Sequence, residues 1–267
     1  MNLGGKRILL TGASGGIGRH IATELGRLGA RLVLVGRERN RLDAVADAIR
    51  TSGGSAVVIN FDLASRAGHE DLVNCAATAL GGLDVLINNA GVQCFGPLAD
   101  NDPVELTRLV AINVTSPLLL TRAALAHFDA AQGGHIVNIG STFGAIGFPQ
   151  FSAYSASKFA LRGMSEALRR ELSDRRVRVT YISPRATATD MNTAAVRALQ
   201  EKTGTRVDDP AKVAQAVVAA IDAGVAEKQL GWPERFFVRL NSLLPRLVDR
   251  ALVRQGRVAA ACARESG

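Results

Sequence analysis

The sequence contains few cysteines and few aromatic residues. Its three cysteines, Cys75, Cys94 and Cys262, form no Cys-x-x-Cys pair and have no companion histidine cluster. We therefore expect neither a disulfide framework nor a metal site. Aromatic residues make up 4% of the chain, which disfavours the stacking surfaces on which nucleic-acid-binding proteins hold bases.

Long apolar runs are also absent. No stretch reaches the roughly 20 apolar residues that span a bilayer, and the first residues, MNLGGKRILL, lack the apolar core of a signal peptide. We therefore expect a cytoplasmic protein. Basic residues outnumber acidic ones, 32 to 24, for a net charge of +8. The arginines are spread along the whole chain, so we interpret the charge as a composition bias and expect no nucleic-acid partner.

Short apolar runs alternate with longer segments of helical periodicity. The runs have the Val, Ile and Leu content of buried parallel strands and lie at 7–10, 31–35, 56–61, 85–87, 135–139 and 177–182. The segments between them carry apolar residues three and four positions apart and lie at 17–28, 41–50, 71–80, 104–128, 153–174 and 210–223. This order predicts a single doubly wound parallel sheet, an α/β Rossmann fold, with ligands beyond the carboxyl ends of the strands. We assign residues 1–231 to this domain and residues 232–267 to a C-terminal helical extension.

A glycine-rich stretch, TGASGGIG at 11–18, follows the first strand directly. Gly12 would permit a tight turn, Gly16 would let the backbone approach a pyrophosphate, and Gly18 would let the helix pack closely on the sheet. The helix N-terminus would then offer its N–H groups to phosphates. The position of the stretch favours a dinucleotide site over a simple strand-to-helix turn.

The second strand lacks the acidic residue that would bind the ribose hydroxyls of NAD at its end. Gly36 and Arg37 stand there instead. A guanidinium can pair with the 2′-phosphate of NADP, so Arg37 favours NADP(H), with NAD(H) as the alternative, unless it is only a solvated member of an Arg-rich segment. Asp62, after the third strand, could accept a hydrogen bond from an adenine amino group or cap a helix or turn.

The stretch YSASK places Tyr154 and Lys158 one helical turn apart, so that their side chains point the same way. A free phenol has a pKa near 10 and is a poor proton donor or acceptor at neutral pH. A neighbouring ammonium favours the phenolate, so we expect Lys158 to lower the pKa of Tyr154 towards the working range of an acid–base catalyst.

These motifs, taken together, resemble the short-chain dehydrogenase/reductase family over roughly residues 5–225. The resemblance rests on TGASGGIG, on NNAG at 88–91, and on Asn113, Ser141, Tyr154 and Lys158 in this order. It implies that Tyr154 is the acid–base group, that Lys158 tunes it and holds the nicotinamide ribose, and that Ser141 orients the substrate oxygen. Asn113 would position a water in a proton relay. Each of these residues could alternatively be a cap or a core side chain.

The resemblance also implies a cofactor site, a substrate class and an assembly. Its cofactor contacts would come from Gly12, Ser14, Gly15, Gly16, Ile17, Gly18, Arg37, Asp62, Leu63, Asn89, Ala90, Gly91, Tyr154, Lys158, Pro184, Thr187 and Thr189. The expected activity is NADPH-dependent hydride transfer to or from a carbonyl or alcohol substrate, which we expect to be hydrophobic, in a homodimer or homotetramer. The alternative is a non-catalytic NADPH-binding regulator or sensor, which would not need the full Asn-Ser-Tyr-Lys set.

The chain departs from the family pattern after the sixth strand. The usual Pro-Gly is Pro184-Arg185 here, so a large cation stands where the backbone would pass close to the nicotinamide. Thr187 and Thr189 remain candidates for binding the carboxamide. Arg185 could face the substrate entrance or the solvent.

Residues 233–255, PERFFVRLNSLLPRLVDRALVRQ, form an amphipathic segment beyond the part that the family requires. Leucines, phenylalanines and valines recur at helical spacing, arginines fall largely between them, and Pro245 should kink or divide the helix. The apolar face could pack over the substrate cleft or a partner subunit, or it could lie peripherally on an anionic membrane.

Overall fold

Seven parallel strands form the centre of the molecule. The computed structural model describes residues 2–131 and 133–265. The strands are β1 Arg7–Thr11, β2 Arg31–Gly36, β3 Ser55–Asn60, β4 Val85–Asn88, β5 Gly134–Ile139, β6 Val177–Ser183 and β7 Glu227–Gln229. Their order is β3-β2-β1-β4-β5-β6-β7, and all neighbouring strands run parallel. The order reverses between β1 and β4, which is where open α/β sheets bind their ligands.

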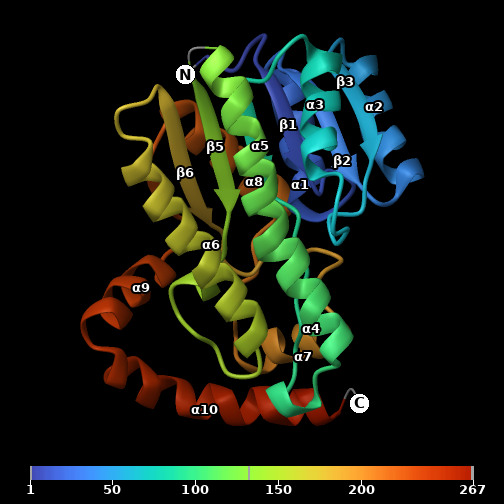
Figure 1. The fold of residues 1–267 in the computed structure, drawn as a ribbon. Coiled ribbons are helices and arrows are strands. Elements are labelled where there is room, and N and C mark those ends of the chain that lie inside the picture. The colour runs from blue at the N-terminus through green and yellow to red at the C-terminus, as the bar shows by residue number, and fades with distance from the viewer. Residues whose placement is uncertain (1, 132, 266–267) are drawn as a thin grey trace.

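Helices cover both faces of the sheet (Figure 1). One layer contains α1 Gly16–Arg27, α2 Arg39–Thr51 and α8 Pro210–Ala223, and the other contains α3 His69–Leu80, α5 Ser116–Ala130 and α6 Ser152–Glu171. Each layer has its own core, because alternate side chains of the strands point to opposite faces. Leu10 and Ile21 belong to the first core, and Leu9 and Phe128 to the second. The predicted doubly wound sheet is therefore confirmed.

The helix predicted at 104–128 is interrupted. It consists of α4 Pro103–Val110, a π-helical turn η2 at Ala111–Thr115, and α5, which continues without a loop. This run of 103–128 is long and apolar enough, by length and composition, to cross a membrane, although polar and charged residues interrupt it. Leu109, Leu120 and Phe128 are buried in the protein core, as in a core helix of a globular domain.

Two elements were not predicted from the sequence. α7, Ala194–Lys202, lies in the segment after β6, and the short strand β7 extends the sheet beyond β6. Two 3₁₀ turns, η1 Leu98–Asp100 and η3 Thr142–Gly144, follow β4 and β5 respectively.

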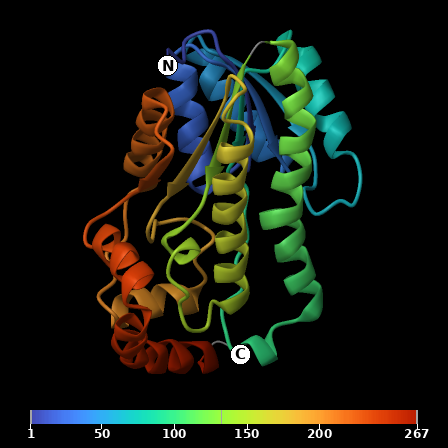
Figure 2. The ribbon, with the colours of Figure 1, turned by 60° about the vertical axis from the view of Figure 1, so that its left-hand side comes forward.

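The C-terminal extension forms two helices, α9 Glu234–Leu243 and α10 Pro245–Arg264. Pro245 is the first residue of α10, so it divides the amphipathic segment as expected, and α10 continues beyond residue 255. Figures 1 and 2 show α10 lying across the end of the molecule to which the strands point, beside α7. Ala259 and Cys262 of α10 share a buried cluster with Val196 and Leu199 of α7.

Candidate active site

A cavity of about 1490 Å³ lies beyond the carboxyl ends of the strands. Residues that follow β1, β2, β4, β5 and β6 line one side of it, and residues of α7, α9 and α10 line another. All of the predicted site residues line this cavity except Gly18 and Asn113. The fold therefore brings the separate sequence motifs to one place.

The glycine-rich turn has the backbone that the sequence predicts. Gly12 has a φ of 67°, and a Cβ there would lie 2.7 Å from the Cα of Ala90. A Cβ at Gly18 would lie 2.0 Å from the carbonyl oxygen of Gly12, so α1 can pack against the turn only without a side chain there. Gly16, with a φ of 52°, begins α1 and leaves the helix N-terminus open to the cavity. These features suit a phosphate-binding turn.

Asn89 supports the turn from the end of β4. Its Nδ2 donates to the carbonyl oxygens of Thr11 and Gly12 at 3.0 and 3.1 Å. The hydroxyl of Thr11 accepts the backbone N–H groups of Asn89 and Ala90 at 3.0 and 3.2 Å. Asn89, which we predicted to contact the cofactor, thus fixes the shape of the glycine turn with its side-chain amide.

Two arginines lie at the α2 end of the cavity. Arg37 is exposed, lines the cavity, and makes no ion pair with any residue of the described ranges 2–131 and 133–265. Arg41, which sequence reasoning missed, lies over the turn: a Cβ at Gly15 would be 3.1 Å from its Nη2. Arg41 also pairs with Asp190 at 2.7 Å, which raises the pKa of its guanidinium. Its place in the same Arg-rich segment as Arg37, near the start of α2, was the available signal.

Asp62 lines the same end of the cavity. Its Oδ1 accepts the backbone N–H of Ala64 at 3.0 Å. This is the turn bond that we considered as an alternative to adenine recognition. A carboxylate has two oxygens and can accept several hydrogen bonds. The turn bond therefore does not exclude the adenine contact, which stays a prediction.

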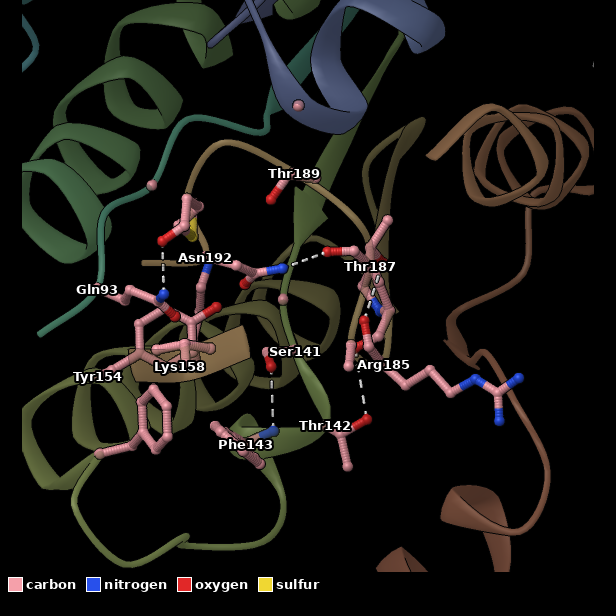
Figure 3. Close-up of a pocket in the computed structure, with 18 of the residues that line it drawn as sticks. Gln93, Ser141, Thr142, Phe143, Tyr154, Lys158, Arg185, Thr187, Thr189 and Asn192 are labelled. Atoms are coloured by element: carbon pink, nitrogen blue, oxygen red, sulfur yellow. Dashed lines mark hydrogen bonds between the residues drawn. The ribbon is translucent and has the colours of Figure 1, made fainter. Parts of the chain in front are cut away.

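Ser141 and Tyr154 meet at the carboxyl end of β5. Ser141 caps the N-terminus of η3, and its Oγ accepts the N–H of Phe143 at 3.1 Å (Figure 3). Tyr154 lies in the first turn of α6, almost fully buried. Burial raises the pKa of its phenol to about 12, because desolvation disfavours the charged form, and a hydrogen bond from Ser141 opposes this rise. The expected lowering of the Tyr154 pKa is therefore wrong for this structure.

Lys158 lies one turn further along α6, with 4% of its surface exposed. Its Nζ is 5.8 Å from the centre of the Tyr154 ring and donates to the carbonyl oxygen of Ile139 at 3.0 Å. The ammonium is therefore anchored to the end of β5 as well as facing the phenol. Burial lowers the pKa of Lys158 to about 8, so the side chain is still mostly protonated at neutral pH.

Asn113 lies in the π-helical turn and does not line the cavity. Its Oδ1 accepts the N–H of Val92 at 2.9 Å, and its Nδ2 donates to the Val92 carbonyl at 2.8 Å and to Ser157 Oγ at 3.0 Å. A Cβ at Gly91 would lie 3.4 Å from Asn113 Oδ1 and 3.5 Å from Lys158 Nζ. The side chain thus fixes the 91–92 backbone beside Lys158.

The segment after β6 closes the cavity above Ser141. Pro184 accepts the N–H of Thr142 at 3.0 Å. The hydroxyl of Thr187 donates to the carbonyl of Arg185 at 2.9 Å, and the Thr187 carbonyl accepts Asn192 Nδ2 at 2.8 Å (Figure 3). Thr189 lies close to Gly16, at 3.5 Å from the position of a Cβ there.

The remaining wall is apolar. Phe143 stacks on Phe148 with ring centres 5.0 Å apart, and it also contacts Phe151 at 5.1 Å and Tyr154 at 6.3 Å. Side chains of the C-terminal extension, including Phe237, also line this part. No cluster of three or more histidine, cysteine or acidic residues suitable for a metal occurs within residues 2–131 and 133–265.

Comparisons with known proteins agree with this geometry. The short chain dehydrogenase family model matches residues 6–200. The chain is 32% identical over 263 residues to dehydrogenase/reductase SDR family member 7B of Bos taurus, covering 94% of this chain and 81% of the relative. It is 34% identical over 224 residues to the glycine betaine reductase ATRR of Emericella nidulans, covering 82% of this chain but only 18% of that larger protein.

Two solved structures share the fold. A short chain dehydrogenase from Burkholderia cenocepacia J2315 in complex with NADP has a TM-score of 0.79 and 30% identity, covering 88% of this chain and 100% of that one. A short chain dehydrogenase/reductase from Burkholderia phymatum in complex with NAD has a TM-score of 0.85 and 25% identity, covering 92% and 96%. Both forms of the nicotinamide cofactor thus occur on this architecture.

Proposed function

Because the chain belongs to the short-chain dehydrogenase/reductase family, we propose that it is an NADPH-dependent oxidoreductase for a hydrophobic carbonyl or alcohol substrate. The observation that carries this proposal is the meeting of Ser141, Tyr154 and Lys158 on one wall of a cavity that also contains the glycine turn. The chemistry needs an oxygen-binding group, a proton donor and a cation, and these three residues supply them.

The residues of the cavity suit a dinucleotide. The N-terminus of α1, with the side-chain-free Gly15 and Gly16, would hold the pyrophosphate. Asp62 and Leu63 would contact the adenine, the Asn89–Gly91 stretch would lie along the ribose, and Pro184, Thr187 and Thr189 would hold the carboxamide end. When bound, the cofactor supplies or accepts the hydride.

Tyr154 supplies the proton. A phenol with a pKa of about 12 is fully protonated at neutral pH, which is the form that donates to a carbonyl oxygen during reduction. The hydroxyl of Ser141, which lines the same cavity as the phenol, would hold that oxygen in place. We therefore propose reduction as the favoured direction at neutral pH, with alcohol oxidation favoured at alkaline pH.

Lys158 and Asn113 support the proton donor. The ammonium of Lys158 would bind the nicotinamide ribose and stabilise the phenolate that forms when Tyr154 gives up its proton. Asn113 fixes the Gly91–Val92 backbone beside Lys158, and we assign it the proton-relay position of the family. Its side-chain atoms are occupied by Val92 and Ser157, so its role would be to position the relay.

A phosphate preference follows from the two arginines at the α2 end. Arg37 is exposed and lines the cavity, and Arg41 lies over the glycine turn. Guanidinium groups match phosphate oxygens with charge-assisted hydrogen bonds. We propose that they bind the 2′-phosphate of NADP(H), and that NAD(H) binds more weakly.

Assay with a panel of ketones and aldehydes tests the proposal. We expect NADPH consumption that depends on the carbonyl compound and increases with its hydrophobic size, because the substrate wall contains Phe143, Phe148 and Phe151. Binding of NADPH without turnover of any compound would favour the alternative, a non-catalytic NADPH sensor.

Self-association is supported by exposed apolar side chains on helices next to the site. Leu118 on α5 and Phe159 on α6 are large apolar side chains that are 48% and 43% exposed, and burial of such side chains between subunits would be favourable. We propose that this helical face joins copies of the chain in a homodimer or homotetramer.

The C-terminal extension supports a peripheral membrane contact by a cytoplasmic enzyme. Around the junction of α9 and α10, Phe236, Leu243, Leu244 and Leu247 are 51–79% exposed, and arginines of the same helices are exposed too. Exposed apolar and cationic side chains together suit the interface of an anionic membrane. Because Leu247 also lines the cavity, a lipid-like substrate would enter the cavity from this side.

A further inference from the structure

Arg185 stands where the family usually has glycine, and its side chain is 7% exposed. Figure 3 shows its guanidinium pointing away from Ser141 and Lys158. The sequence left open whether this cation faces the substrate entrance or the solvent. The structure excludes the solvent-facing position and places Arg185 in the wall of the cavity, away from the catalytic side chains.

The guanidinium binds two other segments of the chain. Its Nε and Nη2 donate to both carboxylate oxygens of Asp208 at 2.8 Å each. Its Nη1 donates to Glu234 Oε2 at 3.1 Å and to the carbonyl oxygen of Trp232 at 3.2 Å. The fork of five donors that distinguishes arginine from lysine is used here to hold three partners at once.

Asp208 fixes the loop that carries the carboxamide-binding threonines. Its N–H donates to the Ala186 carbonyl at 2.8 Å, and its own carbonyl accepts the N–H of Ala188 at 3.0 Å. These bonds place Thr187 opposite Asp208 in an isolated parallel bridge. Arg185 thus connects the end of β6 to both ends of the 186–208 loop.

Glu234 and Trp232 fix the start of the C-terminal extension. Glu234 is the first residue of α9, and Phe237 and Leu240 of this helix line the cavity. Gly231, with a φ of 92°, lets the chain pass directly over the arginine, since a Cβ there would lie 2.7 Å from Arg185 Cδ and 2.9 Å from Glu234 Oε2. The close approach is therefore built into the backbone as well as into the charges.

We propose that Arg185 is a positioning residue, which fastens α9 and the 186–208 loop over the substrate end of the cavity and so sets the affinity for large hydrophobic substrates. This inference deepens the proposed function and depends on it for the nature of the substrate. The fastening itself is independent of catalysis. A partly buried arginine that loses one of its carboxylates is left with an uncompensated charge, so the three groups are expected to act as one unit.

The single tryptophan of the chain offers a readout of this segment, because the backbone carbonyl of Trp232 accepts a hydrogen bond from Arg185 and the residue is 70% exposed, so that the motion of its indole follows the backbone that Arg185 holds. Arg185→Met removes the charge but keeps the length of the side chain, and Glu234→Gln removes only the charge on the extension. We expect the steady-state fluorescence anisotropy of Trp232 to fall in both variants. Arg239→Ala, on the exposed side of the same helix, serves as the matched control and should leave the anisotropy unchanged.

Kinetics then test the consequence for substrate binding. We expect Arg185→Met to raise KM for a long-chain ketone about tenfold, which corresponds to roughly 1.4 kcal/mol, with kcat and the KM for a three- or four-carbon ketone changed less than about twofold. Glu234→Gln should also raise the KM for the long-chain ketone. This second variant keeps the test valid if Arg185→Met does not fold.

Two results would overturn the inference. Unchanged Trp232 anisotropy in both variants would show that the ion cluster does not hold the extension, whether or not the protein is an enzyme. If KM rose equally for long and short ketones, or if the affinity for NADPH fell by a similar factor, Arg185 would instead support the cofactor site. If the proposed function is wrong, the unmutated protein will turn over no ketone. The anisotropy result does not depend on turnover and will still test the fastening.

Discussion

Burial acts on Tyr154 and Lys158 in opposite senses. It raises the pKa of the phenol to about 12 and lowers the pKa of the ammonium to about 8. The sequence predicted the two side chains to be neighbours, because one helical turn separates them. The direction that it predicted for the pKa shift of the phenol was wrong, because the desolvation of a side chain depends on what α6 packs against.

The lysine pKa predicts a pH profile. Lys158 is protonated below about pH 8 and neutral above it, and we assign the stabilisation of the Tyr154 phenolate to its charge. The kcat for carbonyl reduction should therefore be flat from pH 6 to 7.5 and fall as the pH rises beyond about 8. NADPH affinity measured over the same range is the control, and a reduction rate that rises between pH 8 and 9.5 would contradict the assignment.

Arg37 carries the prediction on cofactor choice. Arg37→Ala should weaken binding of NADPH about ten- to a hundredfold and change NADH binding little, since a charge-assisted contact is worth roughly 1.5–3 kcal/mol. Arg39→Ala is the matched control, because Arg39 pairs with Asp43 on the surface of α2. Titration of both cofactors by protein fluorescence measures the effect. Equal affinity of the unmutated protein for NADPH and NADH would remove the basis of the prediction.

At the scale of elements, the sequence predicted strands with continuous apolar runs and missed those without them. β7 has the sequence Glu-Lys-Gln and forms because β6 offers it an edge, which no local pattern reveals. The 3.6-residue period predicted one helix at 104–128, but it does not distinguish an α-helical turn from the π-helical turn that holds Asn113. Arg185 was recognised as a departure, and its partners Asp208 and Glu234, 23 and 49 positions away, were not predictable from spacing.

The α9–α10 junction carries the membrane prediction. The protein should sediment with vesicles that contain anionic lipid at low salt, because each basic residue near such a surface contributes roughly 1 kcal/mol. Leu243→Asp combined with Leu244→Asp should remove the sedimentation, since both side chains are exposed, at 79% and 55%. Val104→Asp, an exposed apolar position near the start of α4, is the control. Sedimentation that the paired substitutions leave unchanged would show that the extension serves only to cover the cavity.

At the scale of the whole molecule, the doubly wound sheet explains why distant motifs work together. The residues after β1, β4, β5 and β6 meet because parallel strands end at the same edge of the sheet. The alternation of runs was sufficient to predict this arrangement. The position of α10 across that edge was left open between alternatives, because an amphipathic pattern shows that a helix has an apolar face but does not identify what covers it.

The assembly can be tested at the same scale. The mass in solution, measured by light scattering on a sizing column, should be two or four times the 28.1 kDa mass of the chain. Phe159→Glu should reduce it to the monomer mass, because a buried and unpaired carboxylate strongly disfavours an apolar interface. A monomeric mass for the unmutated protein would contradict the proposed oligomer but would not affect the catalytic assignment.

The central claim is that Tyr154 donates the proton in an NADPH-dependent reduction. Tyr154→Phe keeps the ring that packs against Phe143 and Phe151 and removes only the hydroxyl. Turnover of NADPH with a ketone that the unmutated protein reduces should be lost, while the affinity for NADPH should stay within about threefold. Retention of more than a few per cent of the activity would contradict the claim.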